Sequence, residues 1–123
     1  MKVNNDIEKL FDKGLDYFNA DEYDEAIKTF NDVLTQNPDH PDAQYYVALC
    51  WANKGKLGKA ISEFTKAIEK DPNDTDALIG RGEVWQNKGK VKRALADFKK
   101  ALNMDPDNPD YKKKVLDLEE RSG

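Results

Sequence analysis

Apolar residues recur every three or four positions in three stretches of the chain. In the middle stretch they are Ala60, Ile61, Phe64, Ala67 and Ile68. This spacing puts them on one face of an α-helix whose other face is polar. The same series occurs earlier as Ala26, Ile27, Phe30, Val33 and Leu34, and later as Ala94, Leu95, Phe98, Ala101 and Leu102. The pattern therefore predicts three amphipathic helices with equivalent apolar faces.

The three series are separated by a fixed distance along the chain. Pro38, Pro72 and Pro106 are 34 residues apart, and so are the alanines and phenylalanines that open each apolar series. A period carried by several residue types indicates stacked copies of one supersecondary unit. The repeats are residues 7–40, 41–74 and 75–108, and 109–123 remain after them.

Each repeat is expected to contain two helices. In the second repeat these are residues 41–53 and 57–70, and Gly55 lies in the turn between them. Glycine after a helix end adopts the left-handed conformation at little cost. The third repeat has the same Lys-Gly-Lys turn around Gly89, whereas the first has Ala20-Asp21-Glu22.

Proline and its neighbours mark where each second helix ends. The residue before proline is disfavoured in helical geometry, so these helices should end at Asn37, Asp71 and Asp105. The next helix then starts behind an Asp or Asn cap, for which Asp74 and Asn108 are the strongest candidates.

Small and aromatic residues also follow the period. Gly14, Ala48 and Gly82 are predicted to face Ala26, Ala60 and Ala94 where paired helices approach, with Tyr17, Trp51 and Trp85 one turn further on. Taken together with the prolines and phenylalanines, this order of residues resembles the tetratricopeptide repeat family over residues 7–108. Residues 109–121 resemble the family's C-terminal solvating helix.

The resemblance implies an all-α fold, an alpha-alpha superhelix of seven antiparallel-packed helices in a single domain, 1–123. The last helix should cover the third repeat with Tyr111, Val115 and Leu118 and keep its charged residues, Lys114 included, in water. Departures from the family pattern are mild. Arg81 occupies a position that is often Leu, and Gly80 is an extra helix-interior glycine, at a cost of about 0.5–1 kcal/mol.

Charge and composition exclude several classes of function. The net charge is −4 and the pI is about 5.0, which argues against general nucleic-acid binding. No apolar run approaches the roughly 18 residues of a membrane span, and the first ten residues lack the apolar core of a signal peptide. The expectation is a cytoplasmic protein with no membrane partner.

Catalytic and metal-binding groups are sparse. His40 is the only histidine and lies in a loop, where solvent exposure is expected. Cys50 is the only cysteine and is interpreted as a small buried hydrophobe. With no Cys/His cluster and no phosphate-binding loop, we expect no enzyme activity, no metal and no cofactor.

The family resemblance implies that the first helix of each repeat lines an inner, concave groove. Aromatic and apolar residues not assigned to the core lie on that side of these helices, as do asparagines at the helix ends. The candidate peptide-binding groove comprises Phe11, Leu15, Asn19, Tyr45, Tyr46, Leu49, Asn53, Ile79, Glu83 and Asn87. Such a groove suits an extended peptide or an amphipathic helix. The alternative is that Tyr45 and Tyr46 only pack against neighbouring helices.

Asn19, Asn53 and Asn87 form a ladder with the repeat spacing. Asparagine both donates and accepts hydrogen bonds, so a ladder of three could bind a peptide backbone. Alternatively, each one simply ends its helix. The series Glu8, Asp42 and Asp76 at the helix starts is explained by the helix dipole.

One known subclass of the family binds the C-terminal carboxylates of heat-shock chaperones through basic and asparagine side chains. The matching positions here are Phe11, Leu15, Tyr46, Asp76 and Gly80. Because none of them is basic or Asn, a chaperone carboxylate clamp is not expected, and a ligand with apolar or basic groups is favoured.

These features predict a non-enzymatic adaptor that binds a segment of another protein in its groove. Two alternatives remain open. The chain could self-associate as a homo-oligomeric scaffold. It could also be a module excised from, or designed after, a larger repeat protein.

Overall fold

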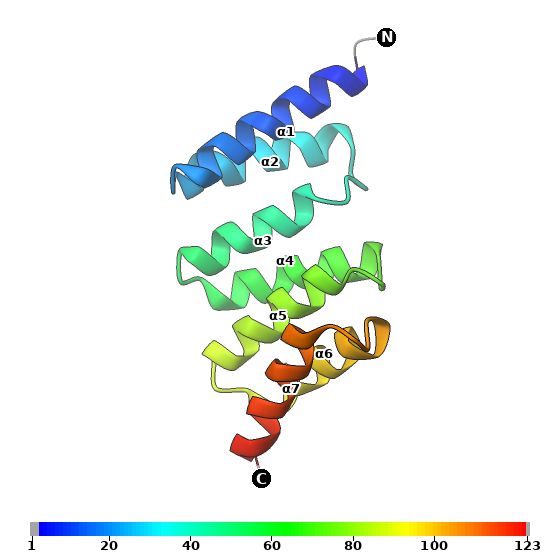
Figure 1. The fold of residues 1–123 in the computed structure, drawn as a ribbon. Helices are drawn as coiled ribbons and strands as arrows, with labels where there is room; N and C mark the ends of the chain where they lie inside the picture. The colour runs from blue at the N-terminus through cyan, green and yellow to red at the C-terminus, as the bar shows by residue number, and fades with distance from the viewer. Residues whose placement is uncertain (1–2, 123) are drawn as a thin grey trace.

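The computed structural model describes residues 3–122, and these form seven α-helices stacked in chain order (Figure 1). The helices are α1 (Val3–Asn19), α2 (Tyr23–Gln36), α3 (Ala43–Asn53), α4 (Leu57–Lys70), α5 (Thr75–Asn87), α6 (Val91–Met104) and α7 (Pro109–Ser122). Each helix packs mainly against its neighbours in sequence, so the array is built from local contacts. The predicted all-α solenoid is confirmed.

Left-handed residues join the two helices of each pair. Gly55 has φ 78° and Gly89 has φ 79°, as their predicted role requires. In the first repeat Asp21 adopts the same conformation at φ 60°, the one positive φ of a non-glycine residue in the described chain. Asp is among the residues that tolerate this region, so all three turns share one geometry.

Side-chain caps start α5 and α7 as predicted. Asp74 Oδ1 accepts a hydrogen bond from the Ala77 N–H at 3.1 Å. Asn108 Oδ1 accepts from the N–H groups of Asp110 and Tyr111 at 3.0 and 3.1 Å. These acceptors satisfy backbone donors that have no partner inside the helix.

The start of α3 differs, because a histidine caps it. His40 Nδ1 accepts from the N–H groups of Ala43 at 3.1 Å and Asp42 at 3.3 Å. His40 is only 6% exposed, and its ring lies 4.8 Å from the Phe11 ring, measured between centroids. The expectation of an exposed His40 was therefore wrong. The loop folds back on α1, and the imidazole nitrogen accepts the backbone hydrogen bonds that a capping carboxylate would otherwise accept.

Three phenylalanines form the centre of the helix pairs. Phe30, Phe64 and Phe98 are each 0% exposed. A Cβ added at Gly14, Gly80 or Gly82 would lie 2.5 Å from the nearest atom of one of these rings. These glycines therefore make room for the phenylalanine rings. Gly80 is accordingly a packing requirement and not a weak point.

An ion pair joins the two helices of the third pair, and a hydrogen bond from the same arginine reaches the second pair. Arg81 donates from Nε and Nη2 to the two carboxylate oxygens of Asp97, at 2.9 and 2.8 Å. Its Nη1 donates to Thr65 Oγ1 at 3.1 Å. Asp97 is 6% exposed, and this bond raises the pKa of the Arg81 guanidinium above its usual value. Arg81 thus has a defined structural role where the family often has Leu.

The last helix covers the end of the array. Val115 and Leu118 are 6% and 1% exposed and pack with Phe98, which confirms their predicted role. Lys114 is half-buried and not fully in water, because its ammonium pairs with Glu83 at 2.9 Å and lies 5.6 Å from the Phe98 ring. α7 therefore contacts α5 as well as α6.

Candidate functional site

The predicted groove residues form three rows across α1, α3 and α5. The first row is Phe11, Tyr45 and Ile79; the second is Leu15, Leu49 and Glu83; the third is Asn19, Asn53 and Asn87. Rows four residues apart lie on one face of a helix, so this side runs along the whole of each first helix. Exposure increases along it. Phe11 is buried, Tyr45 and Leu49 are half-buried, and the three asparagines are exposed.

Tyr46 packs closely against the aromatic rings around it. Its ring stacks on Phe30 with centroids 5.5 Å apart and meets the edges of Phe11 at 5.8 Å and Phe18 at 5.3 Å. Tyr46 and Phe11 are therefore anchored in the core of the first two repeats, and only part of each ring can face a ligand.

Tyr45 lies next to these rings and contacts fewer aromatic neighbours than Tyr46 does. Its ring meets Tyr46 edge-on at 5.4 Å and Phe64 at 5.9 Å. The structure thus brings Phe11, Tyr45 and Tyr46 together near the start of α3, whereas Asn53 lies at the far end of that helix. An 11-residue helix is about 16 Å long, so a ligand touching both ends would span several residues.

A pocket of about 170 Å³ opens where α3 and α5 begin. It is lined by the aromatic residues Phe11, Tyr45 and Tyr46 and by the acidic residues Asp42, Asp74 and Asp76. Asp42 and Asp76 were interpreted from the sequence only as helix-dipole partners, and Asp74 as a cap. Their convergence could not be found by sequence spacing, because it depends on how successive first helices stack.

The pocket carries an uncompensated negative charge. Burial, reinforced by the nearby charges of Asp76, Glu83 and Asp74, raises the pKa of Tyr45 to about 12. Burial also raises the pKa of Asp74, an effect that the hydrogen bond from Ala77 opposes and the Asp76 charge reinforces. A cation placed here would lower the pKa values of both Tyr45 and Asp74.

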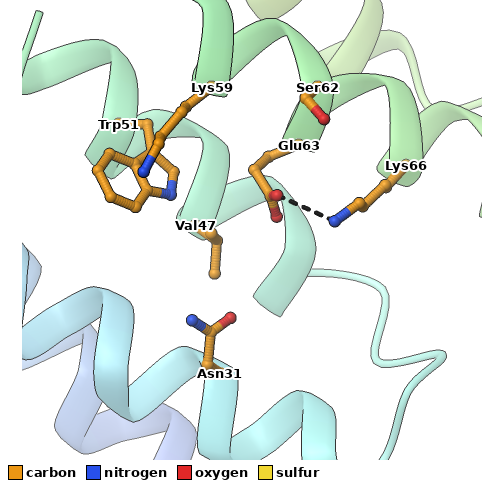
Figure 2. Close-up of a pocket in the computed structure, with 7 residues that line it drawn as sticks. All are labelled: Asn31, Val47, Trp51, Lys59, Ser62, Glu63 and Lys66. Atoms are coloured by element: carbon orange, nitrogen blue, oxygen red, sulfur yellow. Dashed lines mark hydrogen bonds and ion pairs between the residues drawn. The ribbon is translucent and has the colours of Figure 1, made fainter. Parts of the chain in front are cut away.

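A second, larger pocket of about 350 Å³ lies on the other side of α3 (Figure 2). Its lining consists of Asn31, Val47, Trp51, Lys59, Ser62, Glu63 and Lys66. Figure 2 shows the Lys59 side chain crossing the Trp51 ring, where Nζ lies 4.3 Å from the centroid, and Lys66 paired with Glu63 at 3.1 Å. The charged groups drawn there already have partners within the chain. The sequence assigned Trp51 to packing and did not indicate this pocket.

Groups for other chemistry do not converge in the described chain. Within residues 3–122, no set of three or more His, Cys, Asp and Glu side chains is arranged to hold a metal ion. None of the helices in this range combines the length and the apolar character that crossing a bilayer requires. Cys50 is fully buried, and burial raises the pKa of its thiol to about 12.

Paired helices stacked with a 34-residue period, followed by a capping helix, define a helical repeat protein of the solenoid class. Two family models, both described as tetratricopeptide repeat, match residues 11–75 and 52–115. The chain belongs to the tetratricopeptide repeat family. A comparison with curated proteins found no match.

Solved structures share this fold. The first tetratricopeptide domain of Spaghetti (RPAP3), bound to an HSP90 peptide, is similar with a TM-score of 0.86 and 23% identity over 94% of this chain and 91% of that one. The Arabidopsis OM64 domain gives a TM-score of 0.86 and 22% identity, covering 94% and 95%. The Yersinia enterocolitica secretion chaperone SycD, in complex with a peptide of the translocator YopD, gives 0.87 and 14%, covering 97% and 96%.

Proposed function

We propose that the chain is a non-enzymatic interaction module that binds a peptide segment of another protein along α1, α3 and α5. The observation that carries this proposal is the pocket at the start of α3, which is lined by the half-buried rings of Tyr45 and Tyr46. Rings that are partly exposed in a pocket offer apolar area at little entropic cost.

The rest of the face extends the site. Leu15, Leu49 and Ile79 are half-buried and would contact apolar side chains of the ligand, and Asn53 would bond its backbone. Two similar solved domains, those of Spaghetti and SycD, contain bound peptides. This supports peptide binding as a use of the fold, while the residues that do so here remain our proposal.

The test is panning of a random peptide library on the immobilised chain, followed by affinity measurement of the enriched peptides. Two single variants on α3 form a matched pair. Tyr45→Ala removes a half-buried ring from the proposed site, and Trp51→Ala removes a half-buried ring from the pocket on the other side. Tyr46 is left intact because its stacking on Phe30 contributes to the core.

The expected result is an affinity about tenfold or more lower for Tyr45→Ala, and an unchanged affinity for Trp51→Ala. Circular dichroism must show full helicity for both variants. Loss of binding with Trp51→Ala alone would move the site to the other side of α3. If no peptide is enriched and the mass rises with concentration, self-association replaces peptide binding as the function.

A further inference from the structure

The acidic pocket at the start of α3 and α5 has a feature that sets it apart from the rest of the surface. Three carboxylates line it, and no lysine, arginine or histidine is among its lining residues. Asp74 is committed to capping α5 through the Ala77 N–H. Among the described residues, Asp42 and Asp76 form no side-chain hydrogen bond or ion pair, so their charge is available to a ligand.

Elsewhere in the chain, Lys and Arg side chains lie over aromatic rings. Lys13 lies 5.9 Å from the Tyr17 ring, Lys59 lies 4.3 Å from Trp51, and Arg93 lies 4.8 Å from Trp85. These aromatics are the equivalent residues of the three repeats. In residues 3–122 no such cation lies over Tyr45 or Tyr46, although the carboxylates around them would hold one well.

We infer that this pocket receives a lysine or arginine side chain of the bound segment. The aliphatic stem would lie along the Tyr45 and Tyr46 rings, and the cation would sit between Asp42 and Asp76. Because the pocket is lined by carboxylates and aromatic rings, it should select a basic residue flanked by apolar ones. An acidic peptide, such as the HSP90 peptide bound by Spaghetti, would meet three carboxylates of its own sign.

This inference rests on the proposed function, because it names the residue that the groove selects. It adds a charge requirement that peptide binding alone does not have. The two proposals therefore respond to different substitutions, and one experiment can separate them.

The experiment uses the same panning, then compares wild type, Tyr45→Ala and two double variants of the full chain by fluorescence polarisation. Asp42→Asn/Asp76→Asn removes the two available charges and leaves the Asp74 cap in place. Asp107→Asn/Asp110→Asn is the control, since it removes two exposed carboxylates, one in the connection before α7 and one in its first turn. For each enriched peptide, a version with norleucine in place of lysine keeps the stem and removes the charge.

The expected result is enrichment of peptides with a central lysine or arginine among apolar residues. Their affinity should fall about tenfold or more with Asp42→Asn/Asp76→Asn, and little with the control pair. The norleucine peptide should bind weakly to wild type and lose nothing further with the double variant, which is the signature of a direct pair.

Two other outcomes overturn the inference in different ways. If enriched peptides lack a basic residue, and respond to Tyr45→Ala but not to Asp42→Asn/Asp76→Asn, the groove binds peptides and the charge requirement is wrong. If enriched peptides respond to neither, the groove itself is not the site and both proposals fail.

Discussion

At the scale of single residues, the least predictable feature is a polar pair in the interior. Arg81 lies one residue after Gly80 and binds Asp97 on the next helix with two parallel hydrogen bonds. The sequence marked Arg81 only as a departure from a common leucine. Nothing in the spacing of Arg81 and Asp97 distinguishes them from the many surface charges of the chain.

The first prediction concerns this pair. Arg81→Ala should destabilise the protein by about 3 kcal/mol, because it leaves the Asp97 carboxylate buried without a partner. Arg81→Leu/Asp97→Leu should cost clearly less, since neither charge remains. Urea unfolding measures both. Equal losses for the single and double variants would show that the pair adds only packing.

The second prediction concerns Cys50. Burial raises the pKa of the Cys50 thiol from 9.0 to about 12, so the neutral thiol is favoured in the folded state. This contribution to stability is present below about pH 9 and is lost as the pH rises toward 12. Cys50→Ala should therefore lose less thermal stability than wild type between about pH 8 and about pH 10.5. The midpoints by circular dichroism test this, and parallel losses in the two proteins would contradict it.

The surroundings of two buried residues, Phe11 and His40, could not be predicted from the sequence. Phe11 was predicted as a groove contact because it shares the face of Tyr45; it lines the pocket, and its ring also packs against Phe30 and His40. His40 is buried by its contact with α1, a segment about 30 residues away in sequence. Contacts of this kind depend on the stacking of whole helices, which residue type and periodicity do not specify.

At the scale of helices, the sequence was sufficient to predict which segments form the second helix of each repeat. The three amphipathic series became α2, α4 and α6, and the C-cap residue of each directly precedes a proline. The bounds of the first helices were less accurate. α1 begins at Val3, before the first repeat was expected to start, and α3 begins at Ala43 behind the His40 cap. Periodicity determines which segments are helical, whereas caps determine where they begin.

The third prediction separates helix propensity from packing. Gly80→Ala should destabilise the protein by about 1–3 kcal/mol, because the new Cβ would lie 2.5 Å from the buried ring of Phe64. Gly58→Ala is the matched control, since Gly58 is a helical glycine with no atom within 4 Å of an added Cβ. That substitution should stabilise α4 by about 0.5–1 kcal/mol. Denaturation midpoints that move in the same direction would contradict the packing role of Gly80.

At the scale of the whole molecule, charge is distributed unevenly along the solenoid. Residues 1–40 contain ten acidic and four basic residues, whereas residues 75–123 contain nine acidic and eleven basic ones. The proposed pocket opens at the starts of α3 and α5 and is also lined by Phe11 of α1, the helix at one end of the stack in Figure 1, so it lies beside the acidic first repeat. A basic segment would therefore be attracted to this end before it makes contact, and added salt should slow that approach.

The last prediction follows from the raised pKa of Asp74. A lysine-containing peptide prefers the ionised carboxylate, so its affinity should fall as the pH is lowered from about 7 to about 4. The fall should begin above the ordinary aspartate value of 3.8, because burial raises the pKa of Asp74 in the free protein. Asp74→Asn keeps an acceptor for the Ala77 N–H and removes the charge, so it should bind more weakly at pH 7 and show a flatter pH profile. Fluorescence polarisation across this range, with helicity checked at each pH, gives both curves. An affinity independent of pH, or identical slopes for the two proteins, would show that the charge of Asp74 does not contribute to binding of the cation.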